Sequence, residues 1–253
     1  VEIDAYDKTR MAKKRTALGR FAHESAAFGK VEAGKPLSIY MGDDSRGEYI
    51  YKFVSTATWN AADANATDRL AIGDKYLDSG KLYAAKFNAD GTGTWVELSL
   101  SNTAISGYTA YSFADAADIV INTRIAADAV GATKMDRPEW NAVNPANGEI
   151  YFTLTNNSNR SVNPASGQYL PDAANPRAYT DMKGTSAQNG NPNGHLVRMK
   201  EGTSTTSFSW DVYLFGAEAG ADKAMVNISA LTADQDFSSP HDLLSSTAPR
   251  TCE

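Results

Sequence analysis

Lys81-Leu-Tyr-Ala-Ala-Lys-Phe87 and Thr94-Trp-Val-Glu-Leu98 flank the turn sequence Asn88-Ala-Asp-Gly-Thr-Gly93. The flanking runs carry aromatic and aliphatic residues that favour extended backbone, and Asn, Asp and Gly supply the geometry of a tight turn. Two β-prone runs joined by such a turn predict a β-hairpin.

The same pattern of strand, turn and strand returns twice along the chain. It spans Glu139 to Thr155, around Asn144-Pro-Ala-Asn-Gly148, and Gly194 to Phe215, around a Gly/Ser/Thr turn. Glu48-Tyr-Ile-Tyr-Lys-Phe-Val54 alternates as a half-buried strand does. Hairpins at intervals of roughly 40 to 60 residues are typical of propeller blades with insertions, although a β-sandwich also uses short strands and turns. We therefore predict one all-β domain over residues 1–253, a partial or irregular β-propeller with loop and helical insertions, with the β-sandwich as the alternative.

Three segments depart from this pattern. Residues 114–130 are rich in Ala, with apolar residues at near-helical spacing, and Gly131 follows; we expect a helix inserted between blades. In residues 156–193, Asn, Ser, Pro and Gly dominate, which predicts a long irregular loop that is either mobile or functional. Residues 241–253 form an atypical tail that ends in the chain's single cysteine, Cys252, which has no partner for an internal disulfide.

Composition narrows the function classes. The chain has 30 acidic and 24 basic residues and no basic run beyond Lys13-Lys14-Arg15. That triplet predicts a solvated loop or strand end, and the composition argues against nucleic-acid binding. Its apolar stretches are too short to span a membrane, so we expect no membrane span. The sequence begins at Val1 without a methionine or signal peptide, which we interpret as a mature or trimmed chain.

The chemistry is concentrated in Met135-Asp-Arg-Pro-Glu-Trp140. Arginine binds phosphate as a planar fork, and a carboxylate two residues away can hold a metal ion. Similar segments contain His23-Glu24 and Gly42-Asp-Asp44. From the residues alone, each of these groups also has a purely structural interpretation. Glu24 could cap a turn or pair with Arg20, and Glu139 could form a surface ion pair with Arg137. Asp43 and Asp44 could be turn formers, and His23 and His195 could be packed histidines.

Taken together, these segments resemble the PhoX-type alkaline phosphatases over most of Val1 to about Pro240. The resemblance rests on blocks spread along that length: Val1–Phe21, His23-Glu24, Gly42–Val54, Asn122-Thr-Arg124, Ala127–Thr133, Met135–Trp140, Glu149–Asn157, Ala174-Asn-Pro-Arg177 and Gly194-His195. It implies a β-propeller phosphatase that hydrolyses small phosphomonoesters with calcium and iron, in the periplasm or outside the cell.

By motif position, the resemblance implies that Glu24, Asp44 and Glu139 bind metal. It also implies that Arg137 contacts the phosphate oxygens, so that Arg137 and Glu139 are the catalytic pair. The family's cysteine that ligates iron lies upstream of the block that begins at Val1, so calcium is the metal expected here.

Two departures from the family pattern suggest a chain truncated at both ends. The upstream cysteine ligand is missing, and Phe237-Ser-Ser-Pro240 is followed by His241-Asp-Leu-Leu244 instead of the family's Asp and Gly. A partial propeller exposes blade edges, which predicts a homo-oligomer formed through them. The alternative to an enzyme is a non-catalytic, calcium-binding propeller fragment; a sugar- or peptide-binding propeller is a weaker third reading.

Overall fold

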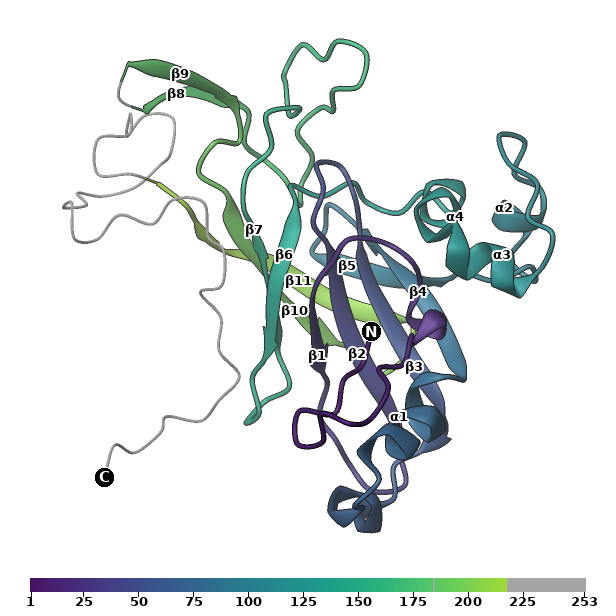
Figure 1. Cartoon of the computed structure of the whole chain (residues 1–253). Coiled ribbons are helices and arrows are strands. Elements are labelled where there is room, and N and C mark those ends of the chain that lie inside the picture. Colours follow the sequence, from purple (N-terminus) through teal and green to yellow (C-terminus); the bar gives the residue numbers. More distant parts are fainter. Residues whose placement is uncertain (184, 218–253) are drawn as a thin grey trace, which may run out of the picture.

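The architecture is dominated by one antiparallel sheet (Figure 1). The structure, a computed structural model, describes residues 1–183 and 185–217. Nine strands of that part follow the order β1-β2-β3-β4-β5-β11-β10-β7-β6, and β8 and β9 form a separate hairpin. The strands are β1 (His23–Phe28), β2 (Pro36–Asp43), β3 (Ile50–Thr58), β4 (Gly80–Phe87), β5 (Thr92–Glu97), β6 (Pro138–Val143), β7 (Ile150–Leu154), β8 (Tyr179–Lys183), β9 (Ser186–Gly190), β10 (His195–Glu201) and β11 (Ser207–Phe215).

The predicted all-β fold class is confirmed, and so are its three hairpins, β4–β5, β6–β7 and β10–β11. The sequence did not reveal how these hairpins combine. β11 pairs with β5 and β10 pairs with β7, so hairpins far apart in the chain join edge to edge into one continuous sheet.

The two ends of this sheet, β1 and β6, come close together. Ser25 Oγ of β1 donates a hydrogen bond to Asn141 Oδ1 of β6 at 2.7 Å, and Asn141 Nδ2 donates to the Tyr40 carbonyl of β2 at 2.7 Å. A Cβ placed on Gly42 would lie 2.5 Å from the Pro138 carbonyl oxygen, so only glycine allows β2 to approach β6 this closely. Side-chain hydrogen bonds and close backbone packing thus bring the ends of β2 and β6 together.

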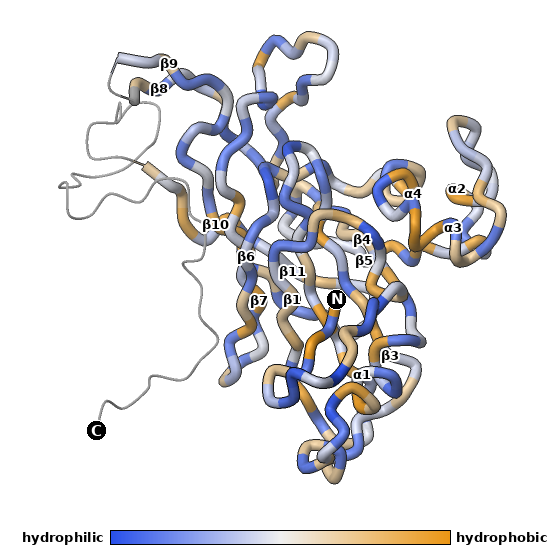
Figure 2. Tube along the Cα trace, viewed as in Figure 1, coloured by the Kyte–Doolittle hydropathy of each residue, from blue (hydrophilic) through white to orange (hydrophobic). Residues whose placement is uncertain are grey.

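Two apolar clusters cover opposite faces of β2, β3 and β4. Ile39, Met41, Tyr51 and Phe53 belong to one cluster, and the alternate residues Tyr40 and Ile50 belong to the other. The strand predicted at 48–54 is therefore buried on both faces instead of one, because insertions cover the face that an isolated hairpin would expose to water. Figure 2 shows the apolar residues following these strands and the adjacent helices.

The expected helix at 114–130 is present as two helices, α3 (Ala116–Ile121) and α4 (Thr123–Ala129), and Gly131 follows at φ 65°. The break has a local cause: Asn122 Nδ2 donates to Asp118 Oδ1 at 2.7 Å, and Thr123 Oγ1 donates to the Val120 carbonyl at 2.8 Å. Asn and Thr side chains that bond to neighbouring polar groups compete with the helical hydrogen bonds. The remaining helices are η1 (Thr16–Leu18), η2 (Ala61–Asn65), α1 (Arg69–Leu77) and α2 (Thr103–Ser106).

The segment 156–193 is less irregular than its composition predicts, because it contains the β8–β9 hairpin. It is hydrophilic along much of its length (Figure 2), yet several of its polar side chains are buried. Those buried side chains are Asn157, Arg160, Asn175, Arg177, Asp181, Asn191 and Asn193. Hydrogen bonding between polar groups, rather than apolar burial, organises this segment.

The basic triplet at residues 13–15 differs from the solvated segment that the sequence predicts. The Arg15 side chain is only 3% exposed and pairs with Glu2, Asp74 and Asp78, which ties the N-terminal segment to α1. Within the described residues, no helix is long and apolar enough to cross a membrane. The tail 241–253 and Cys252 lie outside the described residues, so the predictions about them are untested.

Candidate active site

Arg137 adopts a backbone conformation that is unusual for its residue type. Its φ is 58°, and it is the only residue other than glycine with a positive φ in the described chain. The following residue is Pro138, and a proline restricts the backbone of the residue before it. Such a conformation costs about 1–3 kcal/mol and clusters at functional sites. The Thr155 N–H donates to the Arg137 carbonyl at 3.3 Å and helps to hold it there.

The Arg137 guanidinium lies between two carboxylates. Its Nη2 is 3.0 Å from Glu139 Oε1, 2.9 Å from Asp44 Oδ1 and 3.1 Å from Asp44 Oδ2. The Glu139 side chain is only 3% exposed, whereas those of Asp44 and Arg137 are 22% and 25% exposed. The contact between Arg137 and Glu139 is thus a largely buried ion pair, not the surface pair left open by the sequence.

Within the described residues, Nη2 makes the polar contacts of this guanidinium. Among residues 1–183 and 185–217, Nε and Nη1 of Arg137 donate no hydrogen bond. Nε and Nη1 point to different edges of the guanidinium, so each is available to donate separately from a partly exposed arginine, while the two carboxylates fix its orientation. That arrangement suits an anion with several oxygens, such as a phosphate group.

Asp44 and Glu139 also fit as ligands of a hard cation. Both offer carboxylate oxygens, the donors that Ca²⁺ prefers. Asp44 Oδ1 is buried and receives no hydrogen bond from the part of the chain that the structure describes, because Arg137 Nη2 lies close to it but outside hydrogen-bond geometry. A buried carboxylate oxygen without a donor is unfavourable, and a bound cation would satisfy it.

The third expected metal ligand, Glu24, lies on β1 and is exposed. Its neighbour Ser25 donates to the Glu139 carbonyl at 3.3 Å, so the strands that carry Glu24 and Glu139 are in contact. However, the described residues contain no group of three His, Cys, Asp or Glu side chains placed to hold one metal ion. The structure thus unites Arg137, Asp44 and Glu139, with Glu24 on the adjacent strand.

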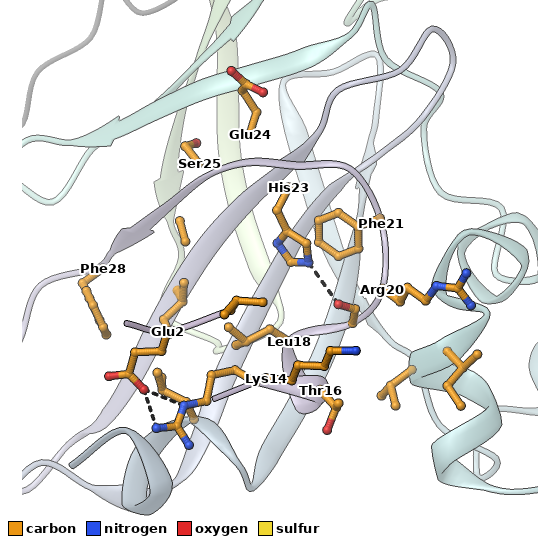
Figure 3. Close-up of a pocket in the computed structure, with 18 residues that line it drawn as sticks. Glu2, Lys14, Thr16, Leu18, Arg20, Phe21, His23, Glu24, Ser25 and Phe28 are labelled. Atoms are coloured by element: carbon orange, nitrogen blue, oxygen red, sulfur yellow. Dashed lines mark hydrogen bonds and ion pairs between the residues drawn. The ribbon is translucent and has the colours of Figure 1, made fainter. Parts of the chain in front are cut away.

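A large cavity of about 880 Å³ lies beside β1 but does not form this site. Figure 3 shows the His23 ring directed into the cavity and the Glu24 carboxylate directed away from it. Apolar side chains such as Leu18, Phe21 and Ile39 form much of its lining, and neither Arg137 nor Asp44 contributes. The ion pairs of Arg137 therefore lie outside this cavity, although Glu24 is one of the residues that line it.

A buried ion pair supports the segment next to Arg137. Asp136 accepts hydrogen bonds from Arg160 Nε at 3.0 Å and Nη2 at 2.9 Å, and both side chains are essentially inaccessible to water. Asn157 and Asn191 donate to the same carboxylate at 2.8 and 3.0 Å. Sequence reasoning missed this role of Asp136 and Arg160; the clue was the polar, asparagine-rich composition of residues 156–193, taken there as a sign of a loop.

The two histidines are packed and hydrogen-bonded, as predicted. His23 stacks on Phe21 with ring centroids 3.6 Å apart, and His23 Nε2 contacts the Gly19 carbonyl at 3.0 Å. His195 is fully buried and contacts the Ala174 carbonyl and Asn191 Nδ2 at 2.8 and 3.0 Å. Burial lowers the pKa of His195, so its neutral form is favoured.

Comparison with known proteins places these features in a family. The family model described as "Alkaline phosphatase PhoX" matches residues 1–248. Among solved structures, the chain is similar to Pseudomonas fluorescens PhoX in complex with vanadate, a transition state analogue, with a TM-score of 0.73 and 35% identity. The match covers 94% of this chain but 39% of that one, so the chain spans about two-fifths of the relative. No curated protein matches the chain.

Proposed function

Because the chain belongs to the PhoX alkaline phosphatase family, we propose that it is a metal-dependent phosphatase that hydrolyses phosphomonoesters. The observation that carries this proposal is the placement of Arg137. It combines a positive φ, ion pairs with Asp44 and Glu139, and two nitrogens, Nε and Nη1, that donate to no other described residue. The vanadate bound to the similar structure, described as a transition state analogue, is consistent with phosphoryl chemistry.

In this proposal, Arg137 donates to an oxygen of the substrate phosphate through Nε or Nη1, the two nitrogens that the carboxylates leave available. Asp44 and Glu139 hold Nη2 and so fix the plane of the guanidinium before substrate arrives. A pre-oriented donor stabilises the transition state because it need not reorganise as charge develops on the phosphoryl oxygens. The catalytic assignments are therefore Arg137 as phosphate ligand and Glu139 as the buried carboxylate that both orients it and holds metal.

We further propose that Asp44, Glu139 and Glu24 bind calcium. When bound, a divalent cation supplies positive charge against the phosphoryl oxygens. Oxygen-only ligands favour calcium, and the described residues offer no thiolate at this site for iron, the family's other metal. Metal binding would relieve the unsatisfied Asp44 Oδ1.

The second candidate is a non-catalytic, calcium-binding fragment. The observation that favours it is the ligand chemistry: Asp44 and Glu139 offer carboxylate oxygens suited to calcium, and the described residues include no cysteine for iron.

We also propose that the chain forms a homo-oligomer through exposed strand edges and that it is located in the periplasm or outside the cell. Analytical sedimentation tests the oligomer, and a well-behaved monomer at high concentration would contradict it. Fractionation of native cells tests the location.

Hydrolysis of p-nitrophenyl phosphate at alkaline pH, with and without added calcium, separates the two candidates. For an enzyme, we expect calcium-dependent turnover that falls at least about 10-fold in Arg137→Ala, since a hydrogen bond to a charged group contributes about 1.5–3 kcal/mol. Arg198→Ala is the matched control, because Arg198 pairs with Asp211 on the β10–β11 hairpin and not with the site. A folded chain that binds calcium without turnover would support the non-catalytic candidate.

A further inference from the structure

Asp43, the neighbour of Asp44, is fully buried, and its carboxylate is held by an arginine from an inserted helix. Arg124 of α4 donates from Nε to Asp43 Oδ2 at 2.7 Å and from Nη2 to Asp43 Oδ1 at 2.6 Å. This is the paired geometry in which a guanidinium binds a carboxylate most strongly. Both Asp43 oxygens are thereby engaged, so of the two adjacent aspartates only Asp44 remains to face Arg137.

The same contact connects the segments that carry Asp44 and Glu24. The Ala22 N–H donates to Asp43 Oδ1 at 3.1 Å, and the Asp44 N–H donates back to the Ala22 carbonyl at 2.9 Å. Ala22 lies two residues before Glu24. The buried Asp43 carboxylate is therefore the point at which the start of β1 and the end of β2 are joined.

Arg124 also holds the other side of Asp44. Its Nη2 donates to Ser45 Oγ at 3.2 Å, so one guanidinium contacts the residues before and after Asp44. The pKa of Arg124 is raised, chiefly by its hydrogen bonds with Asp43, which keeps it charged. Glu48 lies 3.6 Å from Arg124 Nε as a second, weaker acidic neighbour.

We propose that Arg124 is a positioning residue for the metal site: by binding Asp43 and Ser45 it sets the orientation of Asp44 and of the strand that carries Glu24. This inference rests on the proposed function, because it takes Asp44 and Glu24 as calcium ligands. Residues that orient metal ligands without touching the metal typically affect affinity by about 10- to 100-fold. Arg124 does so from α4, outside the sheet that carries the ligands.

The test compares calcium binding by isothermal titration in Arg124→Met, Arg124→Lys and the control Arg198→Met, which removes a similar paired contact elsewhere. We expect affinity to fall about 10-fold or more in Arg124→Met and to recover only partly in Arg124→Lys, because a single ammonium cannot reproduce the fork. The double variant Asp43→Asn/Arg124→Met removes the buried charge together with its partner, and should regain stability without regaining calcium affinity. If the double variant recovered calcium affinity together with stability, the proposal would be overturned.

Amide hydrogen exchange keeps the inference separate from the proposed function. Arg124→Met should accelerate exchange at the Ala22 and Asp44 amides, which donate the two hydrogen bonds described above, while Arg198→Met should not. Unchanged exchange at both amides would refute the positioning role even if the chain binds calcium. A wild-type chain without calcium affinity but with the expected exchange pattern would refute calcium binding and leave the positioning of Asp44 supported.

Discussion

Replacing Arg160 with methionine tests whether the buried ion pair between Arg160 and Asp136, the residue before Arg137, holds residues 156–193 in place. Arg160 donates to Asp136, to the carbonyls of Lys134 and Leu170, and to Asp172, at distances from 2.8 to 3.3 Å. Methionine fills part of the same volume but donates nothing. The Asp136 carboxylate would then be buried with only Asn157 and Asn191 as donors.

Removing one partner of a buried ion pair costs about 3–5 kcal/mol, because the remaining charge is left without compensation. With side-chain exposures of 1% for Arg160 and 0% for Asp136, solvent cannot screen that charge, and we expect about 4 kcal/mol. At about 2–4 °C per kcal/mol for a chain of this size, the melting temperature should fall by about 8–16 °C.

Urea unfolding followed by circular dichroism measures this change, and Arg198→Met is the matched control. Arg198 makes an equivalent two-point contact with Asp211, but those side chains are 36% and 51% exposed, so its loss should cost less than about 1 kcal/mol. The double variant Asp136→Asn/Arg160→Met should be more stable than Arg160→Met by about 2 kcal/mol, because no buried charge remains. If Arg160→Met lost no more stability than Arg198→Met, burial would not govern the strength of this pair, and the reasoning would be refuted.

Two further predictions concern the surroundings of the site. Burial raises the pKa of Glu48 from 4.5 to about 7, so the folded chain binds the carboxyl proton more tightly than the unfolded chain does. The ionised Glu48 therefore lowers the stability of the folded state. This penalty is absent below pH 4.5 and complete above about pH 7. Glu48→Gln should therefore stabilise the protein by about 2 kcal/mol at pH 8 and leave it unchanged at pH 4.5, a magnitude reduced for partial exposure; a pH-independent difference in urea midpoints would contradict this. Gly42→Ala should destabilise the protein by about 1–3 kcal/mol and weaken calcium binding, because the methyl would push against the Pro138 carbonyl and move β6, which carries Glu139. Gly29→Ala is the control, since its methyl would meet the Tyr40 side chain at 3.2 Å; equal losses in the two variants would argue against the close approach of β2 and β6.

Local sequence patterns were sufficient to predict the hairpins and part of the candidate site. Apolar residues on both sides of Gly-containing turns predict β4–β5, β6–β7 and β10–β11, because both strands of a hairpin and their turn lie within one short stretch of chain. Arg137 and Glu139 could be grouped for the same reason: they are two residues apart, and the structure places their charged groups 3.0 Å apart. The resemblance to a phosphatase family added Asp44 and Glu24, which no local pattern connects with Arg137.

Contacts between distant segments were beyond the reach of those patterns. Arg124 and Asp43 are 81 residues apart, and Arg160 and Asp136 are 24 apart, in a chain with 24 basic and 30 acidic residues. Any of these charges is chemically able to pair with any opposite one. Which ion pairs form depends on the close approach of β2 and β6 and on the packing of α4 and of residues 156–193. These long-range contacts exclude water from only a few of the possible ion pairs. The sequence therefore contains the chemical groups of the site and its hairpins, whereas their mutual orientation, including the strained backbone of Arg137, arises from packing between segments that are distant in the chain.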